Sequence, residues 1–480
     1  MLTIQEIFDE IKTSGGLTPS RRLRDIATRF PDQVAFRDKR FGIWNEITYG
    51  EFWTQVQYVG SALNYFGIER NDKVAIHSEN RPEWLIADIG IQSLGAISVG
   101  LYPTNPPAEV QYLLSHSESK ILFAEDQEQV DKALEVSKDV PNLSKIIYFE
   151  EKGLFRYESD KLMRWDDFLD IGKTEYEKDK NFVTSSIDQI KSEDVALMIY
   201  TSGTTGPPKA SMLSHGNMEW TASIIPEISF TPNISNPEYL SYLPLCHVFG
   251  RLVDEIIAIN SIGVINFAES IDTVQRDLAE IQPSIFPAVP RILERMHAGT
   301  LVRMKDASPL KKLLFRTASF FGNITASRRL ENPEDLVAKI TNFIAQILAF
   351  RSLRKKLGLL NVDNAVSGAA PISPEILRFF MSLGVPIYEG YGMTENSAIA
   401  TGNTPDKVKL GTVGTPQAGT EIKLAEDGEI LVRHPGVFLG YYKNEEATKE
   451  VLDSDGSVSY THLRAHETEA ELVCRLLLEK

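Results

Sequence analysis

Alternation of short apolar strands with helices is the feature that most constrains the fold of this 480-residue chain. An N-terminal region predicts strands and helices in turn at residues 73–77, 83–94, 96–101, 107–115 and 120–124. A second region predicts further strands, with helices between them, at residues 195–200, 239–243, 264–267 and 284–289. Such alternation is typical of parallel sheets with helices on their faces. We therefore expect an α/β protein with two doubly wound regions.

Charge and cysteine content exclude several classes of protein. The formal net charge of −16 argues against nucleic-acid binding, which usually requires a basic face. Two cysteines, Cys246 and Cys474, form no disulfide framework, and no metal-ligand spacing is present. The acidic N-terminus lacks the apolar core of a signal peptide. The apolar stretch 85–102 contains Asp88 and three glycines and is too broken to span a bilayer.

These features predict a soluble, cytoplasmic protein without a transmembrane segment. Contact with a membrane surface stays open because residues 310–357 are helical in pattern, apolar and basic at their end. A core-facing helix with a solvated end is the favoured interpretation of that segment. The sequence leaves the oligomeric state open.

The strongest local signal is the segment YTSGTTGPPK, from Tyr200 to Lys209. A predicted strand ends there in a loop with four hydroxyl side chains, two glycines and a lysine. Backbone N–H groups and hydroxyls can hold phosphate oxygens, and Lys209 can neutralise their charge. A flexible polar turn does not explain why a strand and a lysine bracket these residues. The expected phosphate contacts are Thr201, Ser202, Gly203, Thr204, Thr205 and Gly206.

The loop is not a Walker A motif. That motif requires Gly-Lys-Ser/Thr at the start of a helix. Here two prolines separate Gly206 from Lys209, and a strand-like segment, 210–213, follows. The next helix is expected only from near Ser214.

A second polar segment, Ser367-Gly-Ala-Ala-Pro371, precedes a well-marked helix. Ser373 is a natural N-cap, Pro374 fits the first helical position and Gly384 follows the last turn. A strand at 385–388 then leads into EGYGMTE, residues 389–395. Ligands of α/β sheets gather at the carboxyl ends of strands, so both segments are expected at one edge. Alone, YGMTE favours a buried tyrosine and a surface glutamate, and only its pairing with the phosphate loop makes it a strong signal.

The loop 200–209, together with the segments 367–371 and 389–395, resembles the signature of the adenylate-forming (AMP-binding) superfamily, and especially its long-chain fatty acid–CoA ligases. The resemblance runs from about residue 20 to about residue 456. It implies a large adenylation domain of two α/β subdomains, at 1–190 and 191–400, and a small β subdomain at 401–456. Relatives continue with a mobile C-terminal domain. Residues 457–480 do not match it, which predicts a truncated and impaired enzyme.

The resemblance also implies a reaction and a set of roles. ATP activates a fatty acid to an acyl-adenylate, with Mg²⁺ present, and CoA as co-substrate takes the acyl group. Aryl or amino-acid activation, or nucleotide binding without turnover, are the alternatives. The implied catalytic residues are Lys209, His247, Thr394 and Glu395, with Glu395 as metal ligand. The implied nucleotide contacts, besides the phosphate loop, are Gly368, Ala369, Ala370, Pro371, Gly390, Tyr391 and Gly392.

The segment LPLCHVFGR at 243–251 carries His247, which the resemblance places near the reacting carboxylate. The alternative is that His247 has only a structural role, with its ring nitrogens hydrogen-bonded within a turn or the core. The segment 286–291 resembles a strand end of the long-chain ligases, but its Arg291 is expected to be structural and receives no catalytic role.

Overall fold

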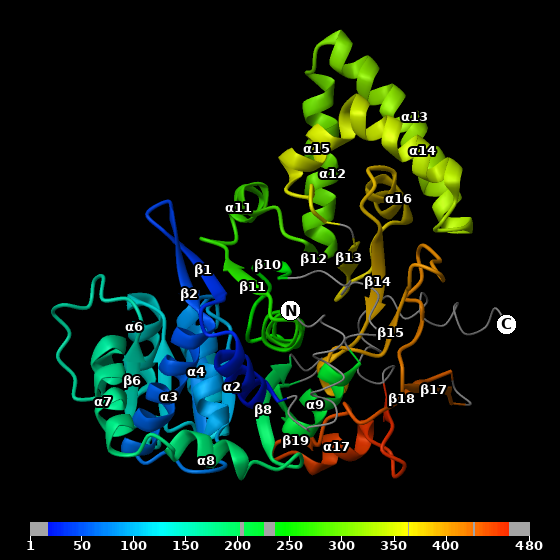
Figure 1. Ribbon diagram of the computed structural model, residues 1–480. Coiled ribbons are helices and arrows are strands. Elements are labelled where there is room, and N and C mark those ends of the chain that lie inside the picture. The colour runs from blue at the N-terminus through cyan, green and yellow to red at the C-terminus, as the bar shows by residue number, and fades with distance from the viewer. Residues whose placement is uncertain (1–17, 202–205, 225–235, 363, 426–427, 460–480) are drawn as a thin grey trace.

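A computed structural model describes residues 18–201, 206–224, 236–362, 364–425 and 428–459. Within these ranges the strands form four sheets, and helices pack around the larger ones (Figure 1). The prediction of an α/β protein is confirmed.

The largest sheet has eight strands, and its central part is parallel. The order across the sheet is β19 (Gly440–Tyr441), β9 (Lys209–Ser214), β8 (Val195–Thr201), β4 (Ile97–Leu101), β3 (Lys73–His77), β5 (Ile121–Ala124), β6 (Lys145–Tyr148) and β7 (Leu162–Arg164). Only β9 and β19 run antiparallel to their neighbours. The strands predicted at 73–77, 96–101 and 120–124 are therefore the middle of this sheet.

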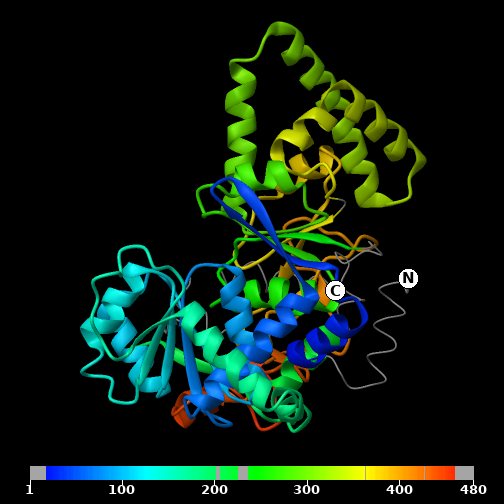
Figure 2. The same ribbon diagram turned by 60° about the vertical axis from the view of Figure 1, so that its left-hand side comes forward.

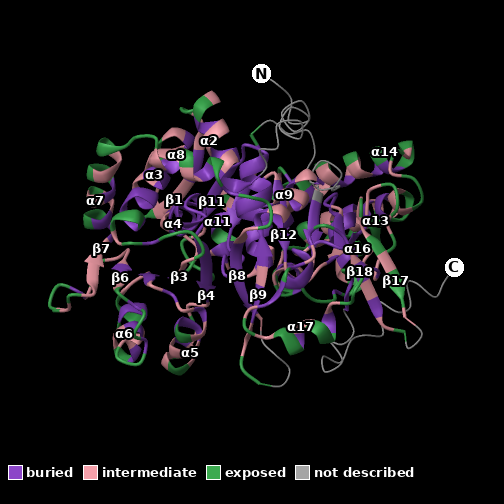
Figure 3. Ribbon diagram, turned by 90° about the horizontal axis from the view of Figure 1, so that it is seen from below, coloured by how far each residue is buried: buried purple, intermediate pink, exposed green. Residues whose placement is uncertain are grey.

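Helices cover both faces of the large sheet, as a doubly wound fold requires (Figure 3). One face carries α3 (Tyr49–Tyr65), α4 (Pro82–Ser93), α7 (Trp165–Lys178) and α8 (Phe182–Asp188), and the other α5 (Pro107–Ser117) and α6 (Gln127–Val136). Local sequence sets their starts. Thr48 and Glu51 form a capping box before α3, and the Asp126 side chain caps α6.

Two further sheets form the second α/β region. The first has the order β10 (Glu238–Ser241), β11 (Val264–Phe267), β1 (Val34–Arg40) and β2 (Ile43–Thr48). The second has the order β12 (Ile285–Ala288), β13 (Asn364–Ser367), β14 (Ile387–Tyr391), β15 (Thr401–Gly402) and β16 (Thr415–Pro416). Around them lie α2 (Pro19–Arg29), α9 (His215–Ser223), α10 (Val248–Gly250), the π-helix η2 (Arg251–Ala258), α11 (Val274–Ile281) and α16 (Pro374–Ser382).

Strand pairing crosses the predicted domain boundaries. β8 lies after residue 190 but pairs with β4, while β1 near the N-terminus pairs with β11. β14 pairs with β15 across residue 400. The division at 190 and 400 stays a prediction about domains, but the chain does not build its sheets in sequential blocks.

The predicted β subdomain at 401–456 contributes to three sheets. Its own small sheet contains β17 (Glu421–Leu424), β18 (Ile430–Arg433) and β20 (Val458–Ser459), next to α17 (Glu445–Val451). β15 and β16 extend the second region, and β19 completes the large sheet. The last of these pairings bears directly on the site.

A helical arm stands out from the rest of the molecule in both side views (Figures 1 and 2). It consists of α12 (Pro290–Lys305), α13 (Pro309–Glu331), α14 (Leu336–Ala345), the π-helical turn η3 (Gln346–Phe350) and α15 (Arg351–Leu357). The stretch Leu336–Leu357 is one continuous helix and, among the described residues, the one long and apolar enough to cross a membrane. Only 22% of its most apolar 18-residue stretch is buried. The favoured prediction of a core-facing helix therefore holds for one side of this helix and not for the other.

Candidate functional site

The strands on either side of the phosphate-loop segment, β8 and β9, pair as an antiparallel hairpin. Thr201 at the end of β8 lies opposite Lys209 at the start of β9, so the two residues close the neck of the loop. Gly206 has a φ of +111°, which favours glycine, and its Cα faces open space. Ser202, Gly203, Thr204 and Thr205 lie outside the described residues.

The two polar segments of the second region share one sheet edge, as predicted. β13 and β14 are parallel neighbours with Ser367 opposite Glu389, so the residues after both strands emerge together. A Cβ on Gly368 would lie 3.3 Å from the Gly390 carbonyl oxygen, which shows how closely the segments approach. Ala369 has a φ of +68°, an unfavourable value for a residue with a side chain. Ala369, Ala370 and Pro371 are exposed at this edge.

The turn after β14 is tightly folded. A Cβ on Gly392 would lie 2.0 Å from the carbonyl carbon of Ala398, so only glycine fits. Ser397 and Ala398 both have positive φ, and the Ser397 hydroxyl donates to the Gly436 carbonyl at 2.6 Å. Backbone strain of this kind persists only where the surroundings hold it. Thr394 and Glu395 lie in this turn as a buried 3₁₀ segment, η4 (Thr394–Asn396).

Glu395 is buried, although the YGMTE segment taken alone favours a surface glutamate. The Tyr441 hydroxyl donates to its Oε1 at 2.8 Å, and its carbonyl accepts from the Phe438 amide at 2.9 Å. Burial raises the pKa of the Glu395 carboxyl, while the Tyr441 hydrogen bond and the Lys209 charge act to lower it. The carboxylate thus sits where its charge is costly and a cation is favoured.

Lys209 reaches the same place from the phosphate-loop hairpin. Its Nζ lies 5.2 Å from the centroid of the Tyr441 ring. Tyr441 itself is on β19, opposite Ser211 of β9. Three segments far apart in the sequence therefore meet at Tyr441: the hairpin, the turn at 394–396 and the strand at 440–441.

Tyr441 is the site residue that sequence reasoning missed. The segment Gly440-Tyr-Tyr-Lys-Asn444 predicted structural turns, and nothing in its local pattern indicates a contact with Glu395. The pairing of β19 with β9 creates that contact. Tyr391, by contrast, lies in the main hydrophobic cluster with 9% of its surface exposed.

His247 lies after β10 and begins α10. Its Nδ1 accepts a hydrogen bond from the Phe249 amide at 3.1 Å, which places the proton of the neutral ring on Nε2. Burial lowers the pKa of His247, which favours that neutral form. Among the hydrogen bonds of the described residues, none joins His247 to Lys209 or Glu395.

The carboxylate at this edge suits a magnesium ion that is shared with phosphates. Within the described ranges no cluster of three or more His, Cys, Asp or Glu side chains could hold a metal by itself. Mg²⁺ usually binds through one or two carboxylates together with substrate phosphates. Glu395, a single carboxylate beside the neck of the phosphate-loop hairpin, fits that requirement.

The hairpin of β8 and β9, the two strand ends and the buried Glu395 on this α/β framework agree with the adenylate-forming class that the sequence resembles. The chain belongs to the family described as AMP-binding enzyme, which matches residues 23–442. It is 30% identical over 466 residues to the long-chain-fatty-acid–CoA ligase ACSBG2 of Xenopus laevis, with 94% of this chain and 61% of that protein covered. The chain thus spans about six tenths of that relative's length.

Two other comparisons agree. The long-chain-fatty-acid–CoA ligase FadD15 of Mycobacterium bovis is 31% identical over 428 residues, covering 89% of this chain and 68% of that protein. A crystal structure of the anthranilate CoA ligase AuaEII with anthranoyl-AMP has a TM-score of 0.67 at 20% identity, covering 92% of this chain and 76% of that one. The likeness to AuaEII establishes the fold alone.

Proposed function

We propose that this chain activates a long-chain fatty acid with ATP and passes the acyl group to CoA. A carboxylate oxygen of the acid attacks the α-phosphorus of ATP, and pyrophosphate leaves. The CoA thiolate then attacks the acyl carbon, and AMP leaves. The names of the ACSBG2 and FadD15 relatives support the fatty acid as substrate class.

One observation carries the proposal: Lys209 at the start of β9 and Glu395 both contact Tyr441, and the turn of Glu395 follows β14, the parallel neighbour of β13. Attack of one anion on another requires positive charge at the phosphates. Lys209 supplies it from the hairpin. A magnesium ion held by Glu395 would offset the charge that develops on the phosphate oxygens.

The remaining residues position the nucleotide. We assign Thr394, beside Glu395 in η4, to the α-phosphate, and the hydroxyls and amides of 201–206 to the other phosphates. Gly368 to Pro371 would border the base, and Tyr391 between Gly390 and Gly392 would stack on it. The strained backbone at Ala369 supports a preformed site there, because such strain clusters where ligands bind.

His247 is assigned to the fatty acid carboxylate. With Nδ1 occupied by the Phe249 amide, Nε2–H is the donor that can hold and orient a carboxylate oxygen. A neutral imidazole orients the nucleophile without protonating it.

Exchange of labelled pyrophosphate into ATP, measured in the presence of different carboxylic acid substrates, tests the activation step. Acetate, octanoate, palmitate, benzoate and mixed amino acids would each be supplied to the 480-residue chain. Exchange that is strongest with palmitate supports the proposal. Strongest exchange with benzoate or an amino acid would assign a different substrate class, and ATP binding without exchange would indicate a nucleotide-binding protein without turnover.

A further inference from the structure

The outer part of the arm, from Pro309 to Leu357, exposes apolar side chains to an unusual degree. Of the seventeen large hydrophobic side chains that are exposed among the described residues, eight lie in this segment. Four of them follow one another along a single helix at i, i+4, i+7 and i+11, which is the spacing of one helical face. These four, the apolar stripe, are Leu336 (69% exposed), Ile340 (52%), Phe343 (66%) and Ile347 (69%).

The opposite face of the same helix packs against the rest of the protein. Ala338, Thr341 and Ala345 are buried, and Thr341 bonds Thr325 of α13 at 2.8 Å. The Gln346 amide donates to the Leu383 carbonyl, and Arg354 donates to the carbonyls of residues 359, 360 and 362. The helix is therefore fixed to the body along one side, and the apolar stripe faces away from its packing partners.

The charge of this outer part of the arm opposes that of the whole chain. Residues 309–357 contain ten Lys and Arg and three Asp and Glu, an excess of seven positive charges, whereas the whole chain carries −16. The three acids, Glu331, Glu334 and Asp335, all lie at the turn between α13 and α14. Exposed basic residues such as Lys311, Arg316, Arg351, Lys355 and Lys356 accompany the exposed Leu310, Leu313 and Phe320 and the apolar stripe.

We propose that this arm is a docking surface for anionic lipid membranes, with the apolar stripe inserted into the headgroup boundary and the basic side chains on lipid phosphates. An amphipathic helix of this composition lies in the plane of the interface. Each basic residue near an anionic surface strengthens binding severalfold. The proposal depends on no residue of the nucleotide site.

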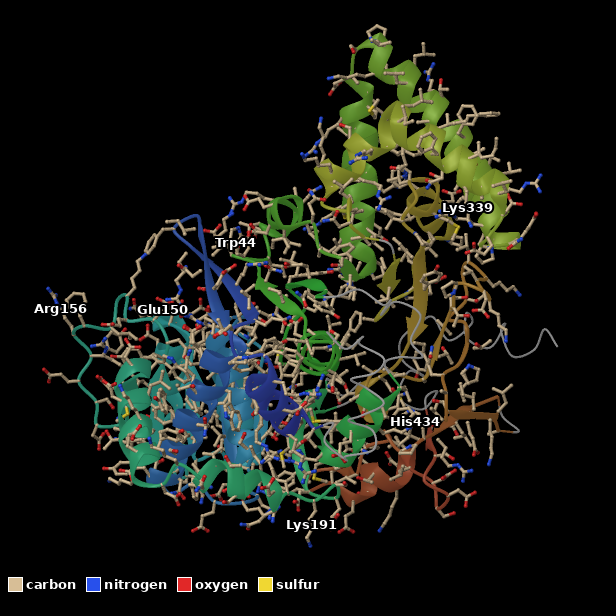
Figure 4. All side chains as sticks on the ribbon, in the orientation of Figure 1. Trp44, Glu150, Arg156, Lys191, Lys339 and His434 are labelled. Carbon is tan, nitrogen blue, oxygen red and sulfur yellow. The ribbon has the colours of Figure 1, made fainter. Side chains whose placement is uncertain are left out.

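Charge favours a membrane over the other possible occupants. A second copy that docked arm against arm would bring two strongly basic segments together. Crossing the bilayer would require the helix Leu336–Leu357 to abandon its hydrogen bonds to Thr325, Leu383 and residues 359–362. Figure 4 shows Lys339 on the arm, well apart from His434 on the main body.

Flotation with lipid vesicles tests the proposal on the full chain. The parent would be mixed with phosphatidylcholine vesicles with and without phosphatidylglycerol, and with the latter at low and high salt. We expect binding to the anionic vesicles alone and release by high salt. Equal binding to both vesicle types, no binding at all, or retention at high salt until detergent is added would overturn the proposal.

Two matched variants locate the contact. Ile340→Ser/Phe343→Ser/Ile347→Ser removes most of the apolar stripe, and we expect roughly tenfold or greater loss of anionic-vesicle binding. Phe41→Ser/Phe155→Ser/Ile271→Ser removes equally exposed side chains elsewhere (101%, 82% and 65% exposed) and should leave binding unchanged. Equal loss in both variants would refute the assignment to the arm. So would a parent dimer in sedimentation that the first variant converts to monomer without any change in lipid binding.

Discussion

The Tyr441 hydroxyl donates a hydrogen bond to Oε1 of Glu395 over 2.8 Å, and both side chains are buried. Glu395 lies on the turn after β14, and Tyr441 lies on β19 beside the phosphate-loop hairpin. The hydrogen bond therefore couples the proposed metal ligand to the proposed phosphate site. It makes Tyr441 a positioning residue.

We expect Tyr441→Phe to raise the pKa of Glu395 further, because a hydrogen bond that lowers it is lost. The acid limb of the pH–rate profile should move to higher pH, and the Mg²⁺ concentration for half-maximal exchange should rise. Stability should fall by about 1–3 kcal/mol. Tyr442→Phe is the control, since that hydroxyl donates to Glu118 instead. Identical pH profiles for the two variants would contradict the coupling.

Glu395→Gln should keep the fold and lower the exchange rate by roughly 10²–10³, the usual effect of removing one preorganised charge. The isosteric amide is preferred to alanine because alanine would leave the buried Tyr441 hydroxyl without its acceptor. Exchange rates as a function of Mg²⁺, together with circular dichroism, measure both effects. Full activity with unaltered Mg²⁺ dependence would remove Glu395 from the site.

Lys209→Ala should weaken ATP use with little change in stability. The side chain is half-buried at the mouth of the hairpin, so we expect a change of only about 0.5 kcal/mol in the free energy of unfolding. The exchange rate should fall by on the order of 10². Lys449→Ala on α17, an exposed lysine in an ordinary helical pair with Glu445, is the matched control. Early melting with normal ATP kinetics would mean that Lys209 is structural.

Gly392→Ala should destabilise the protein by about 3 kcal/mol or more, because the new Cβ would overlap the Ala398 carbonyl. Gly299→Ala on α12 should be neutral or stabilising by up to ~1 kcal/mol, since no atom lies within 4 Å of its Cβ position. Thermal melting of both variants tests this contrast. Similar melting temperatures for the two would contradict the tight turn.

Asp254 predicts a pH dependence of stability. Burial raises the pKa of Asp254 to about 7, against an ordinary value near 3.8, and the Ser241 hydroxyl donates to it. The folded state then holds a proton that the unfolded state releases. This contribution to stability is complete below about pH 4 and is lost as the pH rises to about 7.

Asp254→Asn should remove that contribution. Denaturant melts of parent and variant at several pH values give the difference in unfolding free energy. We expect the difference to change between about pH 4 and 7 and to be constant above. A constant difference throughout would mean that Asp254 ionises normally.

Local features of the sequence determined the elements. The caps and periodicity around Ser373, Pro374 and Gly384 predicted α16, whose cap is the Ser373 side chain. The strand predicted at 264–267 is β11, and the strand before the phosphate loop is β8. The formation of each of these helices and strands depends on interactions within a few residues, and these are the interactions that intrinsic propensities and capping residues indicate. The shared edge of the 367–371 and 389–395 segments followed from parallel strand order alone.

Tertiary structure alone decided which distant segments meet. Nothing in the residues of β1, β8 or β19 specifies pairing with β11, β4 or β9, because strand partners depend on packing across the whole chain. The burial of Glu395 against Tyr441 follows from one such pairing. The apolar stripe on the arm has the same origin: the sequence pattern favours a core-facing helix, and only packing against α13 and the body leaves the stripe uncovered.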